Sequence, residues 1–171
     1  MKRKFLVTGG TGFLGASLVK KLLREGHEVR VLDNESRGRR NRLAEVEGQF
    51  EMTTGDIREP FLVEQAAKGC DSVVHMAFIN GTEFFYSKPE LVLEVGVKGM
   101  VNVLDACKVN SIKDLILISS SEVYQEPPTI PTPENVPLII PDVHNPRYSY
   151  GGGKIISELL ALNYGRKDFE R

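Results

Sequence analysis

The chain has 171 residues, of which 41% are hydrophobic, and this is enough to bury one substantial core. Its formal net charge is −1, so the charge balance does not favour a nucleic-acid partner. The sequence has no apolar run long enough for a membrane span, and a glycine-rich turn stands where a secretory signal would be apolar. Its two cysteines and three scattered histidines lack metal-binding spacing. We therefore expect a cytoplasmic protein without a metal site.

The N-terminal segment predicts a strand, a glycine turn and a helix in succession. Residues Lys4–Thr8 suit a short buried strand, and Gly9, Gly12 and Gly15 follow it with the spacing G-x-x-G-x-x-G. Glycine permits the tight turn, lets the backbone approach a pyrophosphate and lets the next helix pack close to the strand. The helix predicted over Phe13–Arg24 presents free N–H groups and a partial positive charge to a phosphate.

A second strand follows this helix and ends in a carboxylate. The strand carries Val29, Val31 and Leu32, and Asp33 stands at its end, 18 residues after Gly15. A carboxylate at this point can accept hydrogen bonds from ribose hydroxyls. The strand, turn, helix, second strand and acid together predict a dinucleotide site. The alternative is an ordinary βαβ unit with a tight turn.

Four arginines lie in the polar segment after the second strand, at Arg37, Arg39, Arg40 and Arg42. One interpretation is a site for the 2′-phosphate of NADP, and the other is a solvated loop. Because Asp33 would repel a 2′-phosphate, the sequence favours NAD over NADP.

The remaining sequence alternates strands with helices. We expect strands at 49–53, 71–76 and 114–119, helices at 43–47, 59–68 and 90–108, and a loop at 84–86. Continuous apolar runs such as residues 115–118 are typical of parallel strands covered on both faces. The predicted fold over residues 1–171 is a doubly wound, Rossmann-type α/β domain. A helix ends the sequence where a sixth strand would follow, so we expect a fragment truncated before a substrate domain.

A proline-rich segment precedes a tyrosine and a lysine four residues apart. Seven of the nine prolines lie between Pro127 and Pro146, which predicts a long functional or mobile loop. Tyr150 and Lys154 would share one face of a helix. A nearby ammonium lowers the pKa of a tyrosine, which can then exchange a proton at an alcohol carbon while hydride moves to nicotinamide. The alternative for this pair is chance spacing.

Glycines occupy positions 151–153, between these two residues. They indicate either close approach of a cofactor or substrate to the helix face, or a loop with the helix starting near Lys154.

Three serines and a glutamate follow the last predicted strand. Hydroxyls of Ser119, Ser120 and Ser121 would lie beyond the carboxyl end of the sheet, where ligands bind, and can hydrogen-bond a substrate alcohol or oxyanion. The alternative is a serine-rich turn. Glu122 is either a base acting at carbon or a solvated loop acid.

These motifs resemble the extended short-chain dehydrogenase/reductase family, and specifically its NAD-dependent nucleotide-sugar epimerases, dehydratases and decarboxylases. The resemblance covers nearly the whole chain and matches the N-terminal half of such enzymes. It rests on residues 8–15, 32–34, 55–58, 75–77, 119–124 and 150–154. The chain departs from the family pattern at Gly96, usually asparagine, at Gln125, usually glycine, and at the glycine tract.

The resemblance implies a cofactor site that runs from the glycine turn to the Tyr–Lys pair. Its glycines would hold the pyrophosphate, the residues at 33–34 the adenosine ribose and those at 56–57 the adenine. The implied NAD-binding residues are Gly9, Gly12, Phe13, Leu14, Gly15, Asp33, Asn34, Asp56, Ile57, Ala77, Tyr150 and Lys154.

The resemblance also implies catalytic roles. Tyr150 would be the acid/base, with Lys154 binding the nicotinamide ribose and tuning it. Ser120 aligns with the catalytic serine or threonine, and Ser121 with Glu122 aligns with the pair of the dehydratase and decarboxylase branches.

The activity implied is that of an NAD-dependent nucleotide-sugar epimerase or dehydratase that acts through a transient 4-keto sugar, as a homodimer in its full-length form. One alternative is a non-catalytic dinucleotide-binding fragment or sensor. Another is an NADP-dependent keto-sugar reductase, which would release oxidised cofactor at each turnover.

Overall fold

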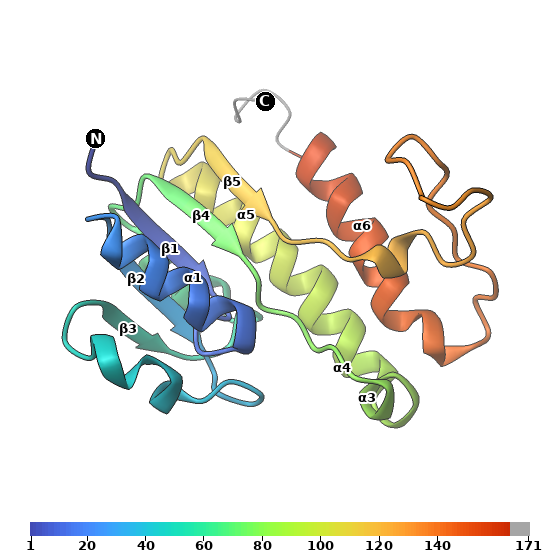
Figure 1. The fold of residues 1–171 in the computed structure, drawn as a ribbon, viewed down its shortest axis with the longest axis horizontal. Helices are drawn as coiled ribbons and strands as arrows, with labels where there is room; N and C mark the ends of the chain where they lie inside the picture. Colours follow the sequence, from blue (N-terminus) through green and yellow to red (C-terminus); the bar gives the residue numbers. More distant parts are fainter. Residues whose placement is uncertain (165–171) are drawn as a thin grey trace.

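Five parallel strands form one sheet in the computed structural model, which describes residues 1–164 (Figure 1). The strands are β1 (Lys4–Thr8), β2 (Glu28–Asp33), β3 (Glu51–Thr54), β4 (Ser72–His75) and β5 (Asp114–Leu117). Their order across the sheet is β3-β2-β1-β4-β5. Because β1 pairs with both β2 and β4, the strand order reverses at β1. The doubly wound parallel sheet predicted from the sequence is confirmed.

Helices alternate with the strands, and the helical structure between β4 and β5 differs from the expected pattern in two ways. Residues 84–86, expected in a loop, belong to a short helix, and the helix expected over 90–108 runs as three segments, the middle one π-helical. The helices are α1 (Phe13–Arg24), α2 (Pro60–Ala67), α3 (Thr82–Ser87), α4 (Pro89–Leu93), the π segment η2 (Glu94–Lys98), α5 (Gly99–Val109) and α6 (Ser149–Asn163), with 3-10 turns η1 (Arg40–Val46), η3 (Ser121–Val123) and η4 (Pro146–Tyr148). None of the helices within residues 1–164 is long and apolar enough to cross a membrane.

The proline-rich segment is a loop, as predicted, because residues 126–145 contain no helix or strand. The domain predicted to extend to residue 171 includes residues 165–171, which lie outside the described part of the chain.

Helices cover the two faces of the sheet in different places. α1 lies over one face, and α2 and α5 lie over the other (Figure 1). Successive strand residues point to opposite faces, so Leu6 of β1 belongs to the core shared with α2 and α5, and Val7 belongs to the core shared with α1. α6 packs beside α4 and η2 and brings its own residues to the edge of the sheet's carboxyl end.

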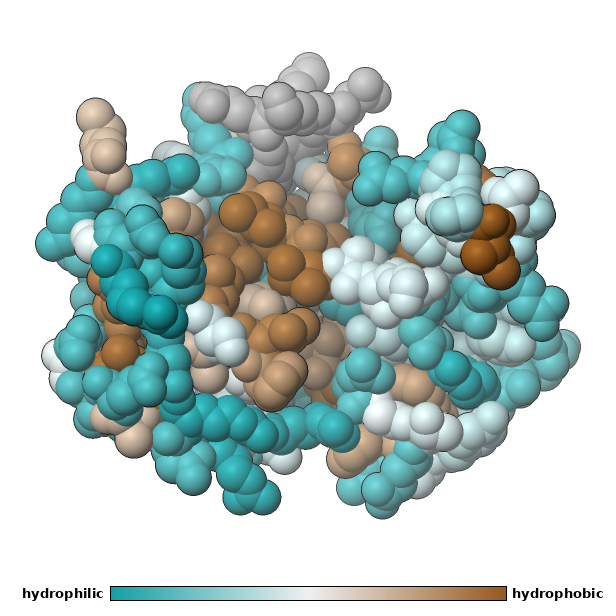
Figure 2. Space-filling view, viewed as in Figure 1, coloured by the Kyte–Doolittle hydropathy of each residue, from teal (hydrophilic) through white to brown (hydrophobic). Residues whose placement is uncertain are grey.

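β5 is only partly covered, in contrast to the expectation that its continuous apolar run is covered on both faces of the sheet. Ile116 of β5 pairs in register with Val74 of β4, so both side chains point toward the α1 face. Ile116 is 45% exposed, because α1 lies over β1 and β2 and does not reach the end of the sheet. Figure 2 shows apolar side chains gathered on this face over β4 and β5.

The glycine tract lies inside α6, which begins at Ser149. The interpretation of the tract as a loop with the helix starting after it is therefore wrong. A β-carbon at Gly151 would lie 3.0 Å from the carbonyl oxygen of Glu122, and one at Gly152 would lie 3.2 Å from Cδ1 of Ile140. The tract thus lets η3 and the proline-rich segment approach one turn of the helix.

We expect Gly152→Ala to stabilise the fold and Gly151→Ala to destabilise it. Alanine in a helix is favoured over glycine by about 1 kcal/mol. The Ile140 side chain is 39% exposed and can turn aside from a methyl group at 152, whereas a methyl at 151 meets the backbone of Glu122. Urea unfolding of both variants and the wild type measures the difference. Equal losses of stability in the two variants would contradict this account of the tract.

Candidate active site

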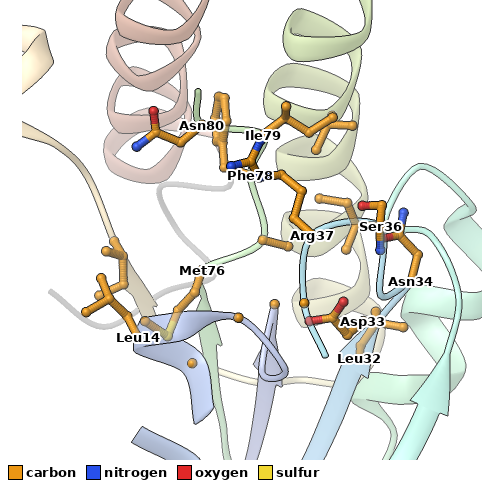
Figure 3. Close-up of a pocket in the computed structure, with 18 of the residues that line it drawn as sticks. Leu14, Leu32, Asp33, Asn34, Ser36, Arg37, Met76, Phe78, Ile79 and Asn80 are labelled. Atoms are coloured by element: carbon orange, nitrogen blue, oxygen red, sulfur yellow. The ribbon is translucent and has the colours of Figure 1, made fainter. Parts of the chain in front are cut away.

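A cleft of about 570 Å³ opens at the carboxyl ends of the strands, where the strand order reverses (Figure 3). The structure brings into its lining every residue that the sequence predicted for the cofactor. These are Gly9, Gly12, Phe13, Leu14, Gly15, Asp33, Asn34, Asp56, Ile57, Ala77, Tyr150 and Lys154. One continuous surface therefore joins the glycine turn to the Tyr–Lys pair.

The glycine turn is made of backbone in close contact. Gly9 has a φ of 72°, and a β-carbon there would lie 2.8 Å from the backbone nitrogen of Ala77. A β-carbon on Gly15 would lie 2.1 Å from the carbonyl oxygen of Gly9, so no other residue fits. Gly12 caps α1 without a side-chain hydrogen bond, and no acidic residue lies in the first turn. The open N–H groups of this turn fit a pyrophosphate.

Asp33 is fixed at the end of β2 by two backbone hydrogen bonds. Its Oδ2 accepts from the N–H of Thr11 at 2.9 Å, and its Oδ1 accepts from the N–H of Glu35 at 2.7 Å. The side chain is only 8% exposed, yet it lines the cleft. Each oxygen keeps a further lone pair, so the carboxylate can still accept a hydrogen bond from a ribose hydroxyl.

Two of the four predicted arginines, Arg37 and Arg42, reach the cleft. The guanidinium of Arg37 lies 4.9 Å from the ring centroid of Phe84, and Nη1 of Arg42 donates to the carbonyl oxygen of Thr11 at 3.0 Å. The other two arginines of the cluster do not line it. The basic charge near Asp33 is thus smaller than the sequence indicated and is partly engaged within the protein.

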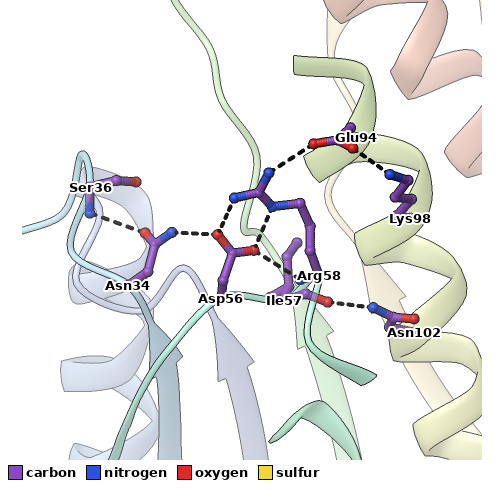
Figure 4. A network of polar contacts seen from close by, with 8 residues as sticks. All are labelled: Asn34, Ser36, Asp56, Ile57, Arg58, Glu94, Lys98 and Asn102. Carbon is purple, nitrogen blue, oxygen red and sulfur yellow. Dashed lines mark hydrogen bonds and ion pairs between the residues drawn. The ribbon is translucent and has the colours of Figure 1, made fainter. Parts of the chain in front are cut away.

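A polar network braces the end of the cleft beside β3 (Figure 4). Nδ2 of Asn34 donates to Oδ2 of Asp56 at 3.0 Å. Arg58 bonds both Asp56 oxygens and, at 2.9 Å, Oε2 of Glu94 on η2. The hydrogen bond from Arg58 is the main cause that lowers the pKa of the Asp56 carboxyl. The loops after β2 and β3 are thereby tied to the helix that closes this end.

Tyr150 and Lys154 lie on one face of α6, as predicted, and both are buried, at 6% and 3% exposure. Nζ of Lys154 donates to the carbonyl oxygen of Ile118 at 2.5 Å. Burial lowers the pKa of Lys154 to about 8. Burial also raises the pKa of Tyr150. The expected lowering of the tyrosine pKa by the lysine is therefore wrong for this structure, because burial outweighs other effects.

The serines after β5 are placed differently from one another. Ser120 accepts from the N–H of Glu122 at 3.2 Å, and its hydrogen bond with Tyr150 opposes the rise in the tyrosine pKa. Ser119 lines the cleft and bonds a glutamate of α6. Ser121 is exposed, and neither it nor Ser120 is part of the cleft lining. Of the three, Ser120 is the one joined to Tyr150.

Glu122 forms a two-pronged ion pair while its side chain remains 31% exposed, so it is a partly solvated acid with a defined partner. Arg147 donates to both of its carboxylate oxygens, at 2.9 and 3.0 Å. The Arg147 guanidinium lies 5.2 Å from the ring centroid of Phe85, and that ring stacks on Tyr150 at 5.3 Å. A chain of contacts thus connects Glu122 to Tyr150 through α3.

Sequence reasoning missed the residues that surround the predicted ones. Phe78 and Phe85 contact the Tyr150 ring, and neither has a motif that predicts this contact. Arg58 belongs to the recognised run at 55–58, and Arg147 lies three residues before Tyr150, but no pattern assigned either a partner.

A backbone-lined turn at a helix N-terminus, an acid at the end of β2 and a buried Tyr–Lys pair define a dinucleotide-binding domain of the Rossmann type. The chain belongs to the NAD dependent epimerase/dehydratase family, whose model matches residues 5–170.

Curated relatives and solved structures agree with this assignment. The chain is 31% identical to UDP-glucuronic acid decarboxylase 1 of Danio rerio over 169 residues, covering 98% of the chain and 39% of that protein. It is 32% identical to UDP-glucose 4-epimerase of Lactobacillus helveticus, covering 92% and 46%. A crystal structure of UDP-galactose 4-epimerase superposes with a TM-score of 0.84 at 31% identity, covering 95% and 52%. The chain therefore spans about half the length of these relatives, or less.

Replacing Lys154 with methionine should remove a pH dependence of stability. The pKa of Lys154 is about 8 in the folded chain and about 10.4 in an unfolded one. Between these values the unfolded chain binds more protons, so the free energy of unfolding should rise with pH in the wild type relative to Lys154→Met. Urea unfolding between about pH 7 and 10.5 measures this. If the free energies of unfolding of the wild type and Lys154→Met change with pH in parallel, the prediction is contradicted. Lys68→Met, at an exposed site, is the control.

Proposed function

We propose that this protein is an NAD-dependent nucleotide-sugar epimerase or dehydratase that acts through a transient 4-keto sugar. The observation that carries the proposal is the continuity of one cleft, which the glycine turn and Asp33 line at one end and Tyr150 and Lys154 line at the other. A dinucleotide held along this surface would bring its nicotinamide to the tyrosine. Relatives of both the decarboxylase and the epimerase type support the nucleotide-sugar class of substrate.

The residues present fit NAD along the whole cleft. Gly9, Gly12 and Gly15 would hold the pyrophosphate at the open N-terminus of α1. Asp33 would accept hydrogen bonds from the adenosine ribose, and Lys154 would donate to the nicotinamide ribose. The bound NAD would supply hydride acceptance from C4 of the sugar and its later return.

The protein's own residues would manage the proton at the C4 hydroxyl. We assign to the Tyr150 phenolate the role of taking this proton, and to the phenol so formed the role of returning it. Burial raises the pKa of Tyr150, and the hydrogen bond from Ser120 acts against that rise. Ser120, hydrogen-bonded to Tyr150, would share the hydrogen bond to the substrate oxygen. Because the pKa of Lys154 is about 8, its ammonium is mostly charged near pH 7 and can donate hydrogen bonds there.

Glu122 bears on the step that follows oxidation at C4. A ketone at C4 acidifies the C5–H bond or labilises a carboxylate on C5. Arg147 occupies both oxygens of this carboxylate, at 2.9 and 3.0 Å, so Glu122 is not free to take a proton until that pair opens. The closed pair therefore favours a reaction branch in which Glu122 does not remove the proton from carbon. The homodimer implied by the resemblance is part of the same proposal.

NAD should bind this chain more tightly than NADP. The Asp33 carboxylate, fixed by two backbone N–H groups, would repel a 2′-phosphate. Calorimetric titration of the chain with each cofactor measures the preference, and Asp33→Asn should reduce it at least about tenfold. Asp71→Asn is the matched control, because Asp71 also accepts a backbone N–H but lies outside the cleft. Equal binding, or tighter binding of NADP, would contradict the choice of NAD and favour a keto-sugar reductase.

Tyr150→Phe should abolish turnover while leaving NAD affinity within about twofold of the wild type. Loss of a proton-transferring group costs about 10²–10⁴ in rate. Conversion of UDP-glucose and UDP-glucuronic acid, followed by chromatography of the products, measures turnover. Tyr148→Phe is the control, because Tyr148 precedes α6 and does not line the cleft. Turnover at the wild-type rate in Tyr150→Phe would refute the assigned role.

A further inference from the structure

Phe78 stands at the Tyr–Lys end of the cleft, just after β4 (Figure 3). Its ring meets the Tyr150 ring edge to face, with centroids 5.0 Å apart. Nζ of Lys154 lies 4.4 Å from the centroid of the Phe78 ring. One aromatic side chain therefore contacts both residues proposed to carry the chemistry.

The ring sits where two helices have no side chain. A β-carbon at Gly96, in the π segment η2, would lie 2.3 Å from Cζ of Phe78. A β-carbon at Gly153, in α6, would lie 3.0 Å from the same atom. The departure from asparagine at position 96 thus has a steric reason, because Phe78 fills the space that a larger residue would need. We call the space left by Gly96 and Gly153 the glycine seat.

The ammonium of Lys154 is held between this ring and the backbone after β5. It donates to the carbonyl oxygen of Ile118 at 2.5 Å and is 3% exposed with the rest of its side chain. The titratable groups that face it are Tyr150 and Glu158 on α6 and His75 on β4. Burial lowers the pKa of His75 to about 3, so the imidazole is neutral. The Phe78 ring face attracts the cation, and so does Glu158, whose charge acts to raise the pKa of Lys154.

We propose that Phe78 is a positioning residue, whose ring in the glycine seat holds the Lys154 ammonium at the Tyr150 end of the cleft. The inference rests on the proposed function, which assigns to Lys154 the hydrogen bond to the nicotinamide ribose. The ring acts in two opposing ways. Its bulk excludes water, which disfavours the charged lysine, and its electron-rich face attracts the cation, which favours it.

Two substitutions of Phe78 separate these effects without any cofactor. The lysine Cε resonance that disappears in Lys154→Met is assigned to Lys154. An NMR titration of this resonance against pH reports the pKa of Lys154. Phe78→Ala admits water, so the pKa should rise by about one unit or more toward the ordinary value. Phe78→Leu keeps most of the apolar bulk but loses the aromatic face, so the pKa should stay at or below that of the wild type. Phe61→Ala, at a 73% exposed phenylalanine of α2, is the control.

A merely structural role for Phe78 would lower the free energy of unfolding and leave the Lys154 pKa unchanged in Phe78→Ala. That result would overturn the proposal. So would a rise in the pKa in Phe78→Leu equal to that in Phe78→Ala, because the aromatic face would then contribute nothing.

The glycine seat provides a second, independent test. Gly96→Ala should push the ring aside and raise the Lys154 pKa in the same direction as Phe78→Ala. In the double variant Gly96→Ala/Phe78→Ala, the alanine at position 96 meets no ring. The pKa of Lys154 in this double variant should therefore equal that in Phe78→Ala alone. Additive shifts would overturn the role of the seat.

NAD titration of the same variants separates this inference from the proposed function. Phe78→Ala should weaken NAD binding about tenfold, because the ammonium is less well placed. Tighter binding would mean that the ring blocks the cofactor and would overturn the proposal. If the wild type binds no NAD while the pKa shifts appear as expected, the proposed function fails and the seat stands. If the wild type binds NAD and the pKa of Lys154 does not change in Phe78→Ala, the inference about Phe78 alone fails.

Discussion

The close approach of the backbone at Gly15 to the carbonyl oxygen of Gly9 governs the rest of the site. A β-carbon at position 15 would lie 2.1 Å from that oxygen, so α1 can begin directly against the end of β1 only with glycine there. This close start places the N-terminus of α1 at the point where the strand order reverses. Asp33 then reaches back to the N–H of Thr11 and fixes the end of β2 to the same turn. The cleft is the space that these backbone contacts leave open.

Burial controls the electrostatics at the opposite end of the cleft. The pKa of Tyr150 is raised, that of Lys154 is lowered to about 8 and that of His75 is lowered to about 3, each chiefly because of burial. All three shifts favour the neutral form, as expected for groups removed from water. A hydrogen bond to the carbonyl oxygen of Ile118, the Phe78 ring face and the attraction of Glu158 therefore hold the Lys154 ammonium at this end of the site. The adjoining Glu122–Arg147 pair is more exposed, at 31% and 30% of the two side chains.

The sequence predicted those features that local spacing determines. The glycine turn, α1 and Asp33 lie within one βαβ unit, so their separation along the chain fixes their separation in space. The Glu122–Arg147 pair joins residues 25 apart across a proline-rich loop with no periodic pattern, and spacing alone cannot predict it. The apolar run of β5 indicated burial, yet Ile116 is 45% exposed, because an apolar strand does not show what covers it. The glycine tract was ambiguous because the packing partners of α6 are remote in sequence.

Phe78, Gly96 and Gly153 have to be considered as one set. Each glycine within a helix costs about 1 kcal/mol relative to alanine, so the pair costs about 2 kcal/mol. A half-buried phenylalanine gains roughly 1–2 kcal/mol from the area it removes from water, which at best offsets that cost. The stability of the fold therefore does not account for the arrangement. What it does accomplish is to place an aromatic face against the one cation at the buried end of the described cleft.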